Sequence, residues 1–535
     1  MPEMPADGTA RTWWRDGVLY QIYPRSFMDT NADGVGDLPG ITQRLDHLQW
    51  LGVDGIWLDP ITVSPNADWG YDVADYCDVD PPLGTLADAE ELIDQAARRG
   101  IRVILDLVPN HTSDQHPWFL DSRSSRDARY RDWYVWRDPK PDGSPPNNWV
   151  NAFDPSKPAW TFDDHTGQYF MNHFLPSQPD LNWWNPEVRD EFDRILQFWF
   201  DRGVAGFRID VVHMLVKDRD LRDNPPAQPD DHWFVRLRGQ QQIYNACQPG
   251  THEVLRRWRA ICEKYDPPRI LIGETHVHEY ELLASFYGND DELNLAFNFL
   301  LIHAPFQAEP LRAIVEGTEA AMPEHSWPVY TLGNHDNTRF PTRWAGGDPA
   351  KARCALVLLM GLRGTPFLYY GDEIGMPDTP IPADRILDPV GIIFNGHYGR
   401  DPERTPMQWT SAAGGGFAPT GVEPWLPYGD AASYNVEAQR DDPTSFLSLT
   451  RDLIALRDDV DALRSGSYTT IATDDNVWAW HRGNGVVVAC NLSDTATSVR
   501  GVTGTIRMSS DPDRAHEVVA GSLTLAPWEA VITAL

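Results

Sequence analysis

At 535 residues the chain exceeds what one compact core usually supports, so we expect one large domain with smaller ones attached. Apolar residues make up 41% of it, an ordinary globular composition. Lys and Arg total 45 against 78 Asp and Glu, and the formal charge of −33 argues against a nucleic acid or an anionic membrane as partner, whereas a neutral substrate is compatible with it.

Short apolar, β-branched or aromatic runs alternate with helix-like segments along the chain, as expected of βα units. Helical patterns fit between several of these runs, at Ile41–Leu51, Leu86–Arg99, Pro186–Asp201 and His252–Tyr265. Eight candidate strands predict a (β/α)₈ TIM barrel of the α/β class, and in chain order they are Val18–Tyr23, Gly55–Leu58, Arg102–Leu107, Gly206–Ile209, Ile270–Gly273, Leu293–Phe297, Val329–Leu332 and Pro366–Tyr370.

Two long segments interrupt the alternation. Residues 112–184 are too long for a βα loop and rich in Trp, Pro, Asn and Asp, which predicts an inserted subdomain after the third strand. Residues 376–438 are irregular, and from about Ser467 short alternating strands such as Val477–His481 predict a C-terminal antiparallel β-sandwich. The predicted domains are a catalytic barrel at 1–111 and 185–465, subdomain B at 112–184 and a C-terminal β-sandwich at 466–535.

Several polar side chains directly follow predicted strands, and the C-terminal ends of barrel strands surround one cavity. An isolated acid after a strand is usually a helix cap or a solvated loop residue. Three acids at three strand ends are instead what sugar cleavage needs, because one carboxylate attacks the anomeric carbon, one carboxyl protonates the leaving oxygen and a third helps to hold the distorted sugar. The residues at these ends are His111, Arg208, Asp210, Glu274, His335 and Asp336.

The segments around these residues resemble the α-amylase family of glycoside hydrolases (family 13), and within it the oligosaccharide α-glucosidase, or oligo-1,6-glucosidase-like, branch. They occur in the family's order and roughly its spacing, and the resemblance extends from about Trp14 into the C-terminal domain. The matching segments are residues 106–111, 206–213, 272–275 and 333–337, with further likeness in 21–27, 68–73, 178–183 and 404–409.

The resemblance implies a catalytic role for each acid. Asp210 would form a covalent glucosyl-enzyme, Glu274 would protonate the leaving oxygen and then activate water, and Asp336 would bind sugar hydroxyls and favour the transition state. Arg208 projects to the same side of its strand as Asp210 and should lower the pKa of that carboxylate. Glu274 should have a raised pKa, because ionised Asp210 and Asp336 lie close to it. Retention by direct attack needs the two carboxyl groups roughly 5 to 5.5 Å apart.

The resemblance also implies which side chains hold the sugar. Tyr71, Asp72 and Arg400 would close the non-reducing end and make a pocket rather than a groove, and His111 and His335 would donate hydrogen bonds to hydroxyls of the same glucose. A lone histidine is more often structural, so this role depends on the resemblance. The complete expected set is Tyr71, Asp72, His111, Phe153, Gln178, Arg208, His335 and Arg400.

The segment Asp-Thr-Asn-Ala-Asp-Gly-Val-Gly-Asp (29–37) has oxygen-bearing residues at alternate positions and a glycine that permits a sharp turn. A polar turn without a metal is the alternative. The side-chain spacing of one, three, five and nine nevertheless predicts a site for Ca²⁺ or Mg²⁺, and the resemblance implies a structural role for it. The expected ligands are Asp29, Asn31, Asp33, Val35 and Asp37.

The N-terminal residues and the cysteines bear on the compartment. Residues 1–10 lack a basic region followed by an apolar run, and no later stretch approaches 18 uncharged apolar residues. The five cysteines are far apart, odd in number and in no paired motif, which favours reduced thiols. We therefore expect a soluble, cytoplasmic protein without a membrane partner.

Together these patterns predict a retaining, exo-acting α-glucosidase that releases glucose from the non-reducing end of a small oligosaccharide. A transglucosylase or glucoside isomerase of the same fold is the first alternative; an endo-acting amylase and a non-catalytic sugar-binding barrel are the others. By the resemblance Val211 leans towards α-1,6 activity, but the continuation at 212–214 departs from the common pattern of the branch, which leaves α-1,4 and α-1,6 linkages open. The sequence does not indicate an oligomeric state.

Overall fold

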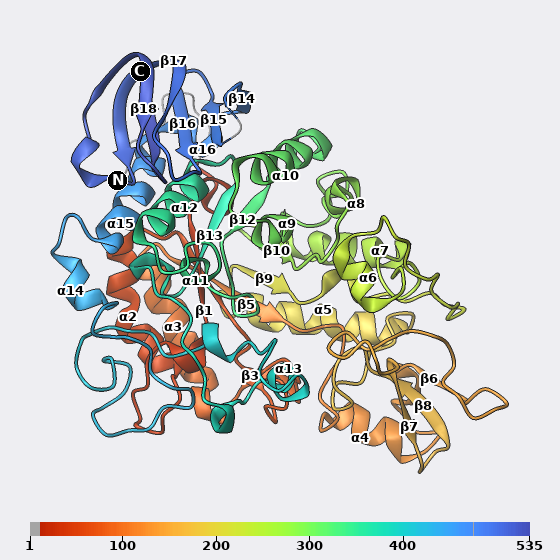
Figure 1. The fold of residues 1–535 in the computed structure, drawn as a ribbon. Coiled ribbons are helices and arrows are strands. Elements are labelled where there is room, and N and C mark those ends of the chain that lie inside the picture. The colour runs from red at the N-terminus through yellow and green to blue at the C-terminus, as the bar shows by residue number, and fades with distance from the viewer. Residues whose placement is uncertain (1–10, 475) are drawn as a thin grey trace.

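The computed structural model describes residues 11–474 and 476–535, so the expectation for the first ten residues lies outside it. Its centre is a sheet of eight parallel strands (Figure 1). These strands read as continuous apolar runs because helices cover the sheet and nearly every strand residue is buried. The strands are β1 (Leu19–Ile22), β2 (Gly55–Leu58), β5 (Arg102–Leu107), β9 (Gly206–Ile209), β10 (Ile270–Gly273), β11 (Leu295–Ala296), β12 (Val329–Thr331) and β13 (Thr365–Tyr369).

The sheet closes into a barrel. Its strand order is β11-β10-β9-β5-β2-β1-β13-β12, and a parallel bridge between Phe297 and Val329 joins the two ends. The predicted (β/α)₈ fold is therefore confirmed. Four of the strands, β2, β5, β9 and β10, have the predicted bounds, and in β2, β9 and β10 the apolar run ends abruptly at an acid.

Helices between the strands surround the barrel. In α3 a capping box of Thr85 and Asp88 fixes the start, the helix buries Ala89, Leu92, Ile93 and Ala96, and Gly100 follows its end with φ 80°. Helix α7 begins three residues earlier than predicted, because Pro249 fits the first turn of a helix. The longer helices are α2 (Leu38–Leu51), α3 (Leu86–Arg98), α5 (Pro186–Phe200), α7 (Pro249–Cys262), α10 (Ala308–Ala321), α12 (Pro349–Gly361) and α15 (Phe446–Asp459).

The inserted subdomain lies between β5 and α5 and extends from the rim of the barrel (Figure 1). It contains α4 (Pro117–Ser124) and a small antiparallel sheet of order β6-β8-β7, formed by Trp136–Arg137, Gln168–Met171 and Trp160–Asp163. A bridge between His111 and Asp180 connects its base to the end of β5. The subdomain therefore begins beside the residues that follow the third barrel strand.

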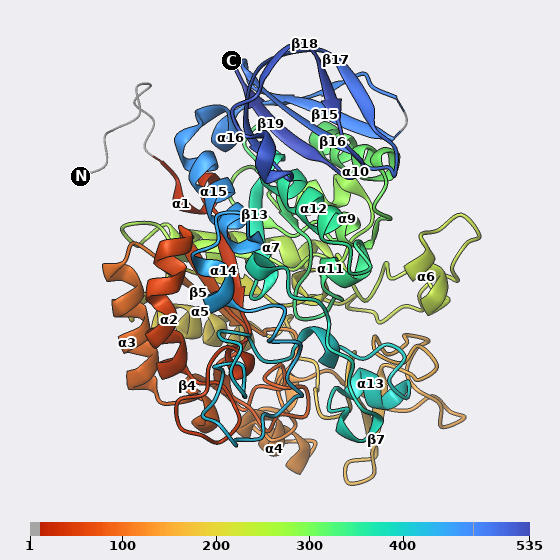
Figure 2. The ribbon, with the colours of Figure 1, turned by 60° about the vertical axis from the view of Figure 1, so that its left-hand side comes forward.

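Two irregular segments also reach this end of the barrel. Residues 217–248, between β9 and α7, contain the short helix α6 (Trp233–Arg238), which has no buried residue. The long stretch after β13 contains α13 (Pro389–Ile393). Figure 2 shows α6 and α13 on the same side of the molecule. Residues 217–248 had no predicted element, because they carry neither helical nor alternating periodicity.

The C-terminal domain lies at the opposite end of the molecule from the inserted subdomain (Figures 1 and 2). Its six antiparallel strands have the order β14-β15-β16-β19-β17-β18 and share a hydrophobic cluster of their own. Trp480 of β15 packs on helix α12 and donates from Nε1 to the Gly361 carbonyl at 3.0 Å. The strands are β14 (Tyr468–Ile471), β15 (Val477–Arg482), β16 (Val486–Asn491), β17 (Thr497–Ser509), β18 (Val518–Leu525) and β19 (Ala530–Ala534).

Over the described residues, no helix combines the length and apolar character needed to cross a bilayer.

Candidate active site

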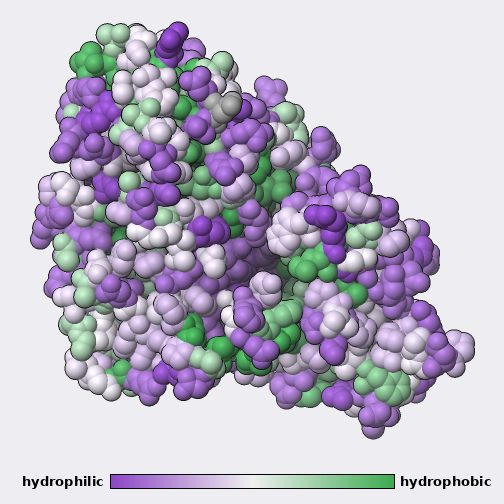
Figure 3. Space-filling view, in the orientation of Figure 1, coloured by the Kyte–Doolittle hydropathy of each residue, from purple (hydrophilic) through white to green (hydrophobic). Residues whose placement is uncertain are grey.

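A cavity of about 290 Å³ opens at the C-terminal ends of the barrel strands. Figure 3 shows a recess on this side of the molecule, with apolar as well as polar residues at its rim. The cavity walls come from the barrel, from the inserted subdomain and from the two irregular segments that carry α6 and α13. One set of loops therefore encloses a single space at the rim, as the barrel fold dictates.

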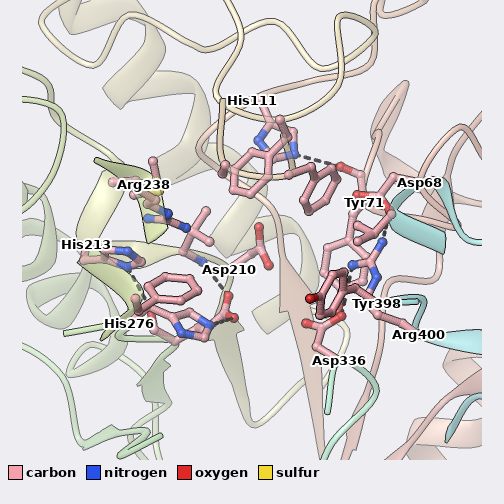
Figure 4. A pocket seen from close by; sticks show the side chains of 18 residues that line it. Asp68, Tyr71, His111, Asp210, His213, Arg238, His276, Asp336, Tyr398 and Arg400 are labelled. Carbon is pink, nitrogen blue, oxygen red and sulfur yellow. Dashed lines mark hydrogen bonds and ion pairs between the residues drawn. The ribbon is translucent and has the colours of Figure 1, made fainter. Parts of the chain in front are cut away.

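Asp210, Glu274 and Asp336 all line this cavity. They follow β9, β10 and β12, which are separated along the chain but end at the same rim. Figure 4 shows Asp210 and Asp336 facing the same space. The three predicted acids are thus brought together by strand topology.

The guanidinium of Arg208 lies beneath the cavity and joins two of these acids. Its Nη1 is 2.9 Å from Asp210 Oδ1 and its Nη2 is 2.8 Å from Glu274 Oε2. The same side chain also meets Asp106 at 2.9 Å and lies over the Trp57 ring. Because alternate residues of a strand face the same side, Arg208 and Asp210 of the β9 segment point together into the barrel mouth. Arg208 holds the two carboxyl groups in fixed relative positions without lining the cavity itself.

The directions of the Asp210 and Glu274 pKa shifts are opposite to those expected from the sequence. Burial, and then the charge of Glu274, raise the pKa of Asp210 well above its usual value. Burial also disfavours ionised Glu274, but Arg208 and His276 outweigh it and place the pKa of Glu274 well below its usual value. The reason is the number of donors, since Glu274 accepts from Arg208, from His276 Nε2 at 2.9 Å and from Val211 N at 2.8 Å.

Asp210 and Glu274 contact the same guanidinium, and neighbouring carboxyl groups cannot both ionise freely. Between their two pKa values the pair therefore holds one proton. In this arrangement the proton resides nearer Asp210. Sequence reasoning missed the asymmetry because it depends on two contacts of Glu274, from His276 and from the Val211 amide, that only the folded chain brings together.

Asp336 has a different environment. Its Oδ1 is 3.0 Å from Arg400 Nη1 and 2.8 Å from Arg404 Nη2, and His335 lies 3.3 Å from Oδ2. Burial opposes its ionisation, yet His335, Arg400 and Arg404 together lower the pKa of Asp336. Asp336 is therefore a carboxylate at neutral pH and keeps acceptor capacity towards the cavity.

Tyr71 and His335 form the floor behind the acids. Their rings are parallel with centroids 5.2 Å apart, and Tyr71 Oη lies 2.7 Å from His335 Nε2. Tyr71 lines the cavity, whereas His335 lies behind it with Nδ1 2.7 Å from Gln21 Nε2. Burial lowers the pKa of His335 to about 3, so the ring is neutral. Of this pair, only Tyr71 lines the space that a sugar would fill.

His111, Phe153 and Arg400 line the cavity, as expected. His111 Nε2 lies 2.9 Å from the Tyr71 carbonyl, and burial lowers the pKa of His111 to about 4. The Arg400 guanidinium sits 5.1 Å from the Phe153 ring centroid and contacts Asp68 and Asp388, each at 2.7 Å. One end of the cavity is therefore closed by a partly buried cation that is paired with carboxylates.

Asp72 does not lie in the cavity, which corrects the expectation for that residue. Its Oδ1 accepts from Ser64 Oγ and Asp68 N, and its Oδ2 accepts from Ala67 N, all at 2.9 Å. The turn in between, with positive φ at Trp69 and Gly70, directs Asp68 to the cavity in its place. Gln178 is also behind the wall, where Nε2 donates to Asp68 Oδ2 and to the Tyr71 carbonyl, each at 3.1 Å.

Several cavity residues were absent from the expected set. Asp68 and His213 belong to segments that already supported the resemblance, so the sequence did carry a signal for them. Phe234, Arg238, Tyr398 and Val390 come from the two irregular segments, where no periodicity or motif pointed to them. His276 was visible only as part of an unusual sequence after Glu274.

The segment 29–37 is a tight loop remote from the cavity lining. Asp29 Oδ1 accepts from Asn31 N and Ala32 N, at 3.0 and 2.7 Å, and Asp29 Oδ2 accepts from Gly34 N at 2.9 Å. Asp37 caps helix α2 through Gly40 N at 2.7 Å. Its oxygen donors suit a hard cation. Within residues 11–474 and 476–535 no three His, Cys, Asp or Glu side chains are grouped as a metal site, so a cation here would also need the Asn31 and Val35 oxygens.

Comparison with known proteins gives consistent results. A family model described as the alpha amylase catalytic domain matches residues 21–466. The chain is 41% identical to a probable alpha-glucosidase of Rhizobium meliloti over 91% of each chain, and 37% identical to an oligo-1,6-glucosidase of Heyndrickxia coagulans over 91% of this chain and 93% of that one. The crystal structure of an alpha-glucosyl transfer enzyme superposes with a TM-score of 0.92 at 38% identity, covering 98% and 99% of the two chains.

Proposed function

The chain belongs to the α-amylase family of glycoside hydrolases, and from that premise we propose that it is a retaining, exo-acting α-glucosidase acting on short α-glucosides. The observation that carries the proposal is the cavity that holds Asp210, Glu274 and Asp336 and is closed at one end by Arg400 and its carboxylates. Such a cavity accepts the end of a chain rather than its middle. Glucose release from the non-reducing end follows.

In the first step Asp210 attacks the anomeric carbon while Glu274 gives its proton to the glycosidic oxygen, and the bond to the leaving alcohol breaks. In the second step Glu274 takes a proton from water, whose oxygen displaces Asp210 and regenerates both carboxyl groups. Two displacements at one carbon retain its configuration. Arg208, which contacts both acids, keeps the attacking oxygen oriented in each step.

The single proton of the carboxyl pair must reach Glu274 before the first step. In the present arrangement the directions of the two pKa shifts favour the proton on Asp210, so it must pass to Glu274 when the sugar binds. A sugar bound against Asp210 places the glycosidic oxygen beside Glu274, and the proton then serves the leaving group. Asp336 stays ionised throughout and stabilises the positively charged transition state.

Exo action is supported by the closed wall of the cavity. Arg400 spans Asp68, Asp388 and Asp336, at 2.7, 2.7 and 3.0 Å, and Phe153 covers its face. An endo-acting amylase needs a cleft that continues past this point. Chain-length profiles on amylose distinguish the two: glucose appears from the first minutes with exo action, and long fragments appear with endo action.

Transfer to a sugar acceptor is the second candidate, favoured by the likeness to an alpha-glucosyl transfer enzyme. The experiment that tests both is a time-resolved product analysis with maltose, isomaltose, kojibiose, nigerose, sucrose and trehalose. Glucose alone supports hydrolysis, and new oligosaccharides support transfer. The same panel tests the α-1,6 preference that Val211 suggests, and no turnover of any sugar would support a non-catalytic barrel.

We further propose that the loop at 29–37 holds a structural Ca²⁺ or Mg²⁺ through Asp29, Asn31, Asp33, Val35 and Asp37. The support is its all-oxygen donor set at alternate positions and the positive φ of Ala32 and Gly34, which gives the sharp turn. When bound, the ion would stabilise the loop before α2. We also propose a reducing, cytoplasmic location, supported by five free cysteines.

A further inference from the structure

The cavity has two chemically different walls. Figure 4 shows Asp210 between them, with Asp336, Tyr398 and Arg400 on one side and His213, Arg238 and His276 on the other. The first wall is the closed end, where the proposed function places the non-reducing glucose. The second wall lies beside Glu274, since His276 Nε2 is 2.9 Å from Glu274 Oε1. The leaving group, which receives the proton of Glu274, must therefore lie against this second wall.

Charge is balanced on the first wall. Four carboxylates line the cavity, and each contacts an arginine: Asp68 and Asp336 meet Arg400, and Asp210 and Glu274 meet Arg208. None of these acids is left to compensate another cation.

Arg238 on the second wall has no such partner. Within the described part of the chain, no carboxylate lies within 4.0 Å of its guanidinium, although the residue lines the cavity and is only partly exposed. Its Nη1 donates to the Gln242 side chain, and its Cζ lies over the Phe234 ring, 4.3 Å from the ring centroid. Burial lowers the pKa of Arg238 to about 10, so it remains a cation at neutral pH. Other donors of this guanidinium are free to meet a ligand.

Its neighbours on this wall add no negative charge beyond Glu274. The rings of His213 and His276 are 6.1 Å apart, and those of His232 and His278 are 4.0 Å apart. Burial, together with the nearby His232, His276 and Arg238, lowers the pKa of His278 to about 3, so this ring is neutral. Burial lowers the pKa of His232 despite the opposing charge of Glu279, and Glu279 is exposed to solvent. With these imidazoles neutral, Arg238 presents a cation to this side of the cavity without a carboxylate partner among the described residues, and such a cation favours an anionic ligand.

We propose that this wall is an aglycone subsite for leaving groups that carry a phosphate or a carboxylate. The proposal rests on the proposed function, because the subsite is defined by the leaving group of that reaction. A planar guanidinium binds either anion through two parallel hydrogen bonds, and the Phe234 ring orients that plane before the ligand arrives. The anion remains on the departing alcohol, since only the glycosidic bond is cleaved.

The test compares matched pairs of substrates that differ by one anion: trehalose with trehalose 6-phosphate, sucrose with sucrose 6′-phosphate, and α-glucosylglycerol with α-glucosylglycerate. The first two pairs probe phosphate and the third probes carboxylate. We expect kcat/KM to favour the anionic member at least tenfold in one arm, and the ratio to fall as salt concentration rises.

Arg238→Gln should lower that ratio towards one, and Arg238→Lys should restore part of it, with unchanged melting temperatures showing that the fold is intact. Arg236→Gln is the matched control, since Arg236 is exposed on the same helix and does not line the cavity. Equal turnover of neutral and anionic members, or a ratio that Arg238→Gln leaves unchanged, overturns the subsite while the glucosidase stands. Glucose from no member of any pair rejects the proposed function, and the subsite with it.

Discussion

His276 should control when the proposed catalytic pair, Asp210 and Glu274, takes up its second proton, and replacing it by Phe should move the pH profile. The His276 ring lies parallel to Phe299 with centroids 4.3 Å apart, so a Phe ring can take its place. What the substitution removes is the donor 2.9 Å from Glu274 Oε1. That donor stabilises the ionised form of Glu274 and is one of the causes of its lowered pKa.

A hydrogen bond to a charged group contributes about 1.5 to 3 kcal/mol, which corresponds to about 1 to 2 pKa units. Removing it destabilises the carboxylate and therefore raises the pKa of Glu274. In the proposed mechanism the active form carries one proton on the Asp210 and Glu274 pair. This singly protonated form disappears at low pH, when a second proton binds to the pair. The acid limb of kcat/KM should thus move to higher pH by about 1 to 2 units in His276→Phe.

The assay is the pH dependence of kcat/KM with a neutral chromogenic α-glucoside, which has no titrating group of its own before cleavage, so the profile reports groups of the free enzyme. His47→Phe is the matched control, because His47 contacts Glu373 at 3.4 Å outside the cavity and should leave the limb in place. An acid limb that stays within about 0.3 units of the parent, or moves to lower pH, would refute the reasoning about the pair.

Three further predictions concern the wall, the fold and the loop. Asp68→Asn should lower kcat/KM about 10- to 100-fold, because Arg400 loses a buried partner. Asp72 faces away from the cavity, so Asp72→Asn should change the melting temperature and leave kcat/KM within a few fold. Equal losses of activity in the two variants would contradict this division. Arg400→Met leaves buried carboxylates uncompensated and should reduce the free energy of unfolding by about 3 to 5 kcal/mol, measured by denaturant titration. An unchanged unfolding midpoint would count against a stabilising role of the Arg400 ion pairs. Chelator should lower the melting temperature and added Ca²⁺ or Mg²⁺ restore it, whereas identical melting curves would remove support for a cation at 29–37.

The barrel was predictable from the sequence because its strands are short apolar runs with sharp polar ends. Gly206–Ile209 and Ile270–Gly273 are examples, and the acids that follow them must meet at the rim once the sheet closes. The choice between Asp68 and Asp72 was not predictable, since it depends on the backbone turn at Trp69 and Gly70. A motif specifies which residue types are present and not which way a loop directs them.

The second wall was beyond sequence reasoning for another reason. Arg238 and Phe234 belong to a segment without periodicity, and their position over the cavity is set by the folding of residues 217–248. The difference in pKa between Asp210 and Glu274 could not be predicted from the sequence either. It depends on hydrogen bonds to Glu274 from the Val211 amide and the His276 ring, which form only in the folded chain.

The proposed attack by Asp210 on the sugar can be tested directly. A 5-fluoro-α-glucosyl fluoride reacts with a retaining α-glucosidase faster than the product ester hydrolyses, so mass spectrometry of the intact protein, followed by peptide mapping, reveals the esterified side chain. We predict one fluoroglucosyl unit per chain, attached to Asp210, and no labelling of Asp210→Asn. Attachment to any other residue, or rapid turnover with inverted configuration and no adduct, would contradict the double displacement.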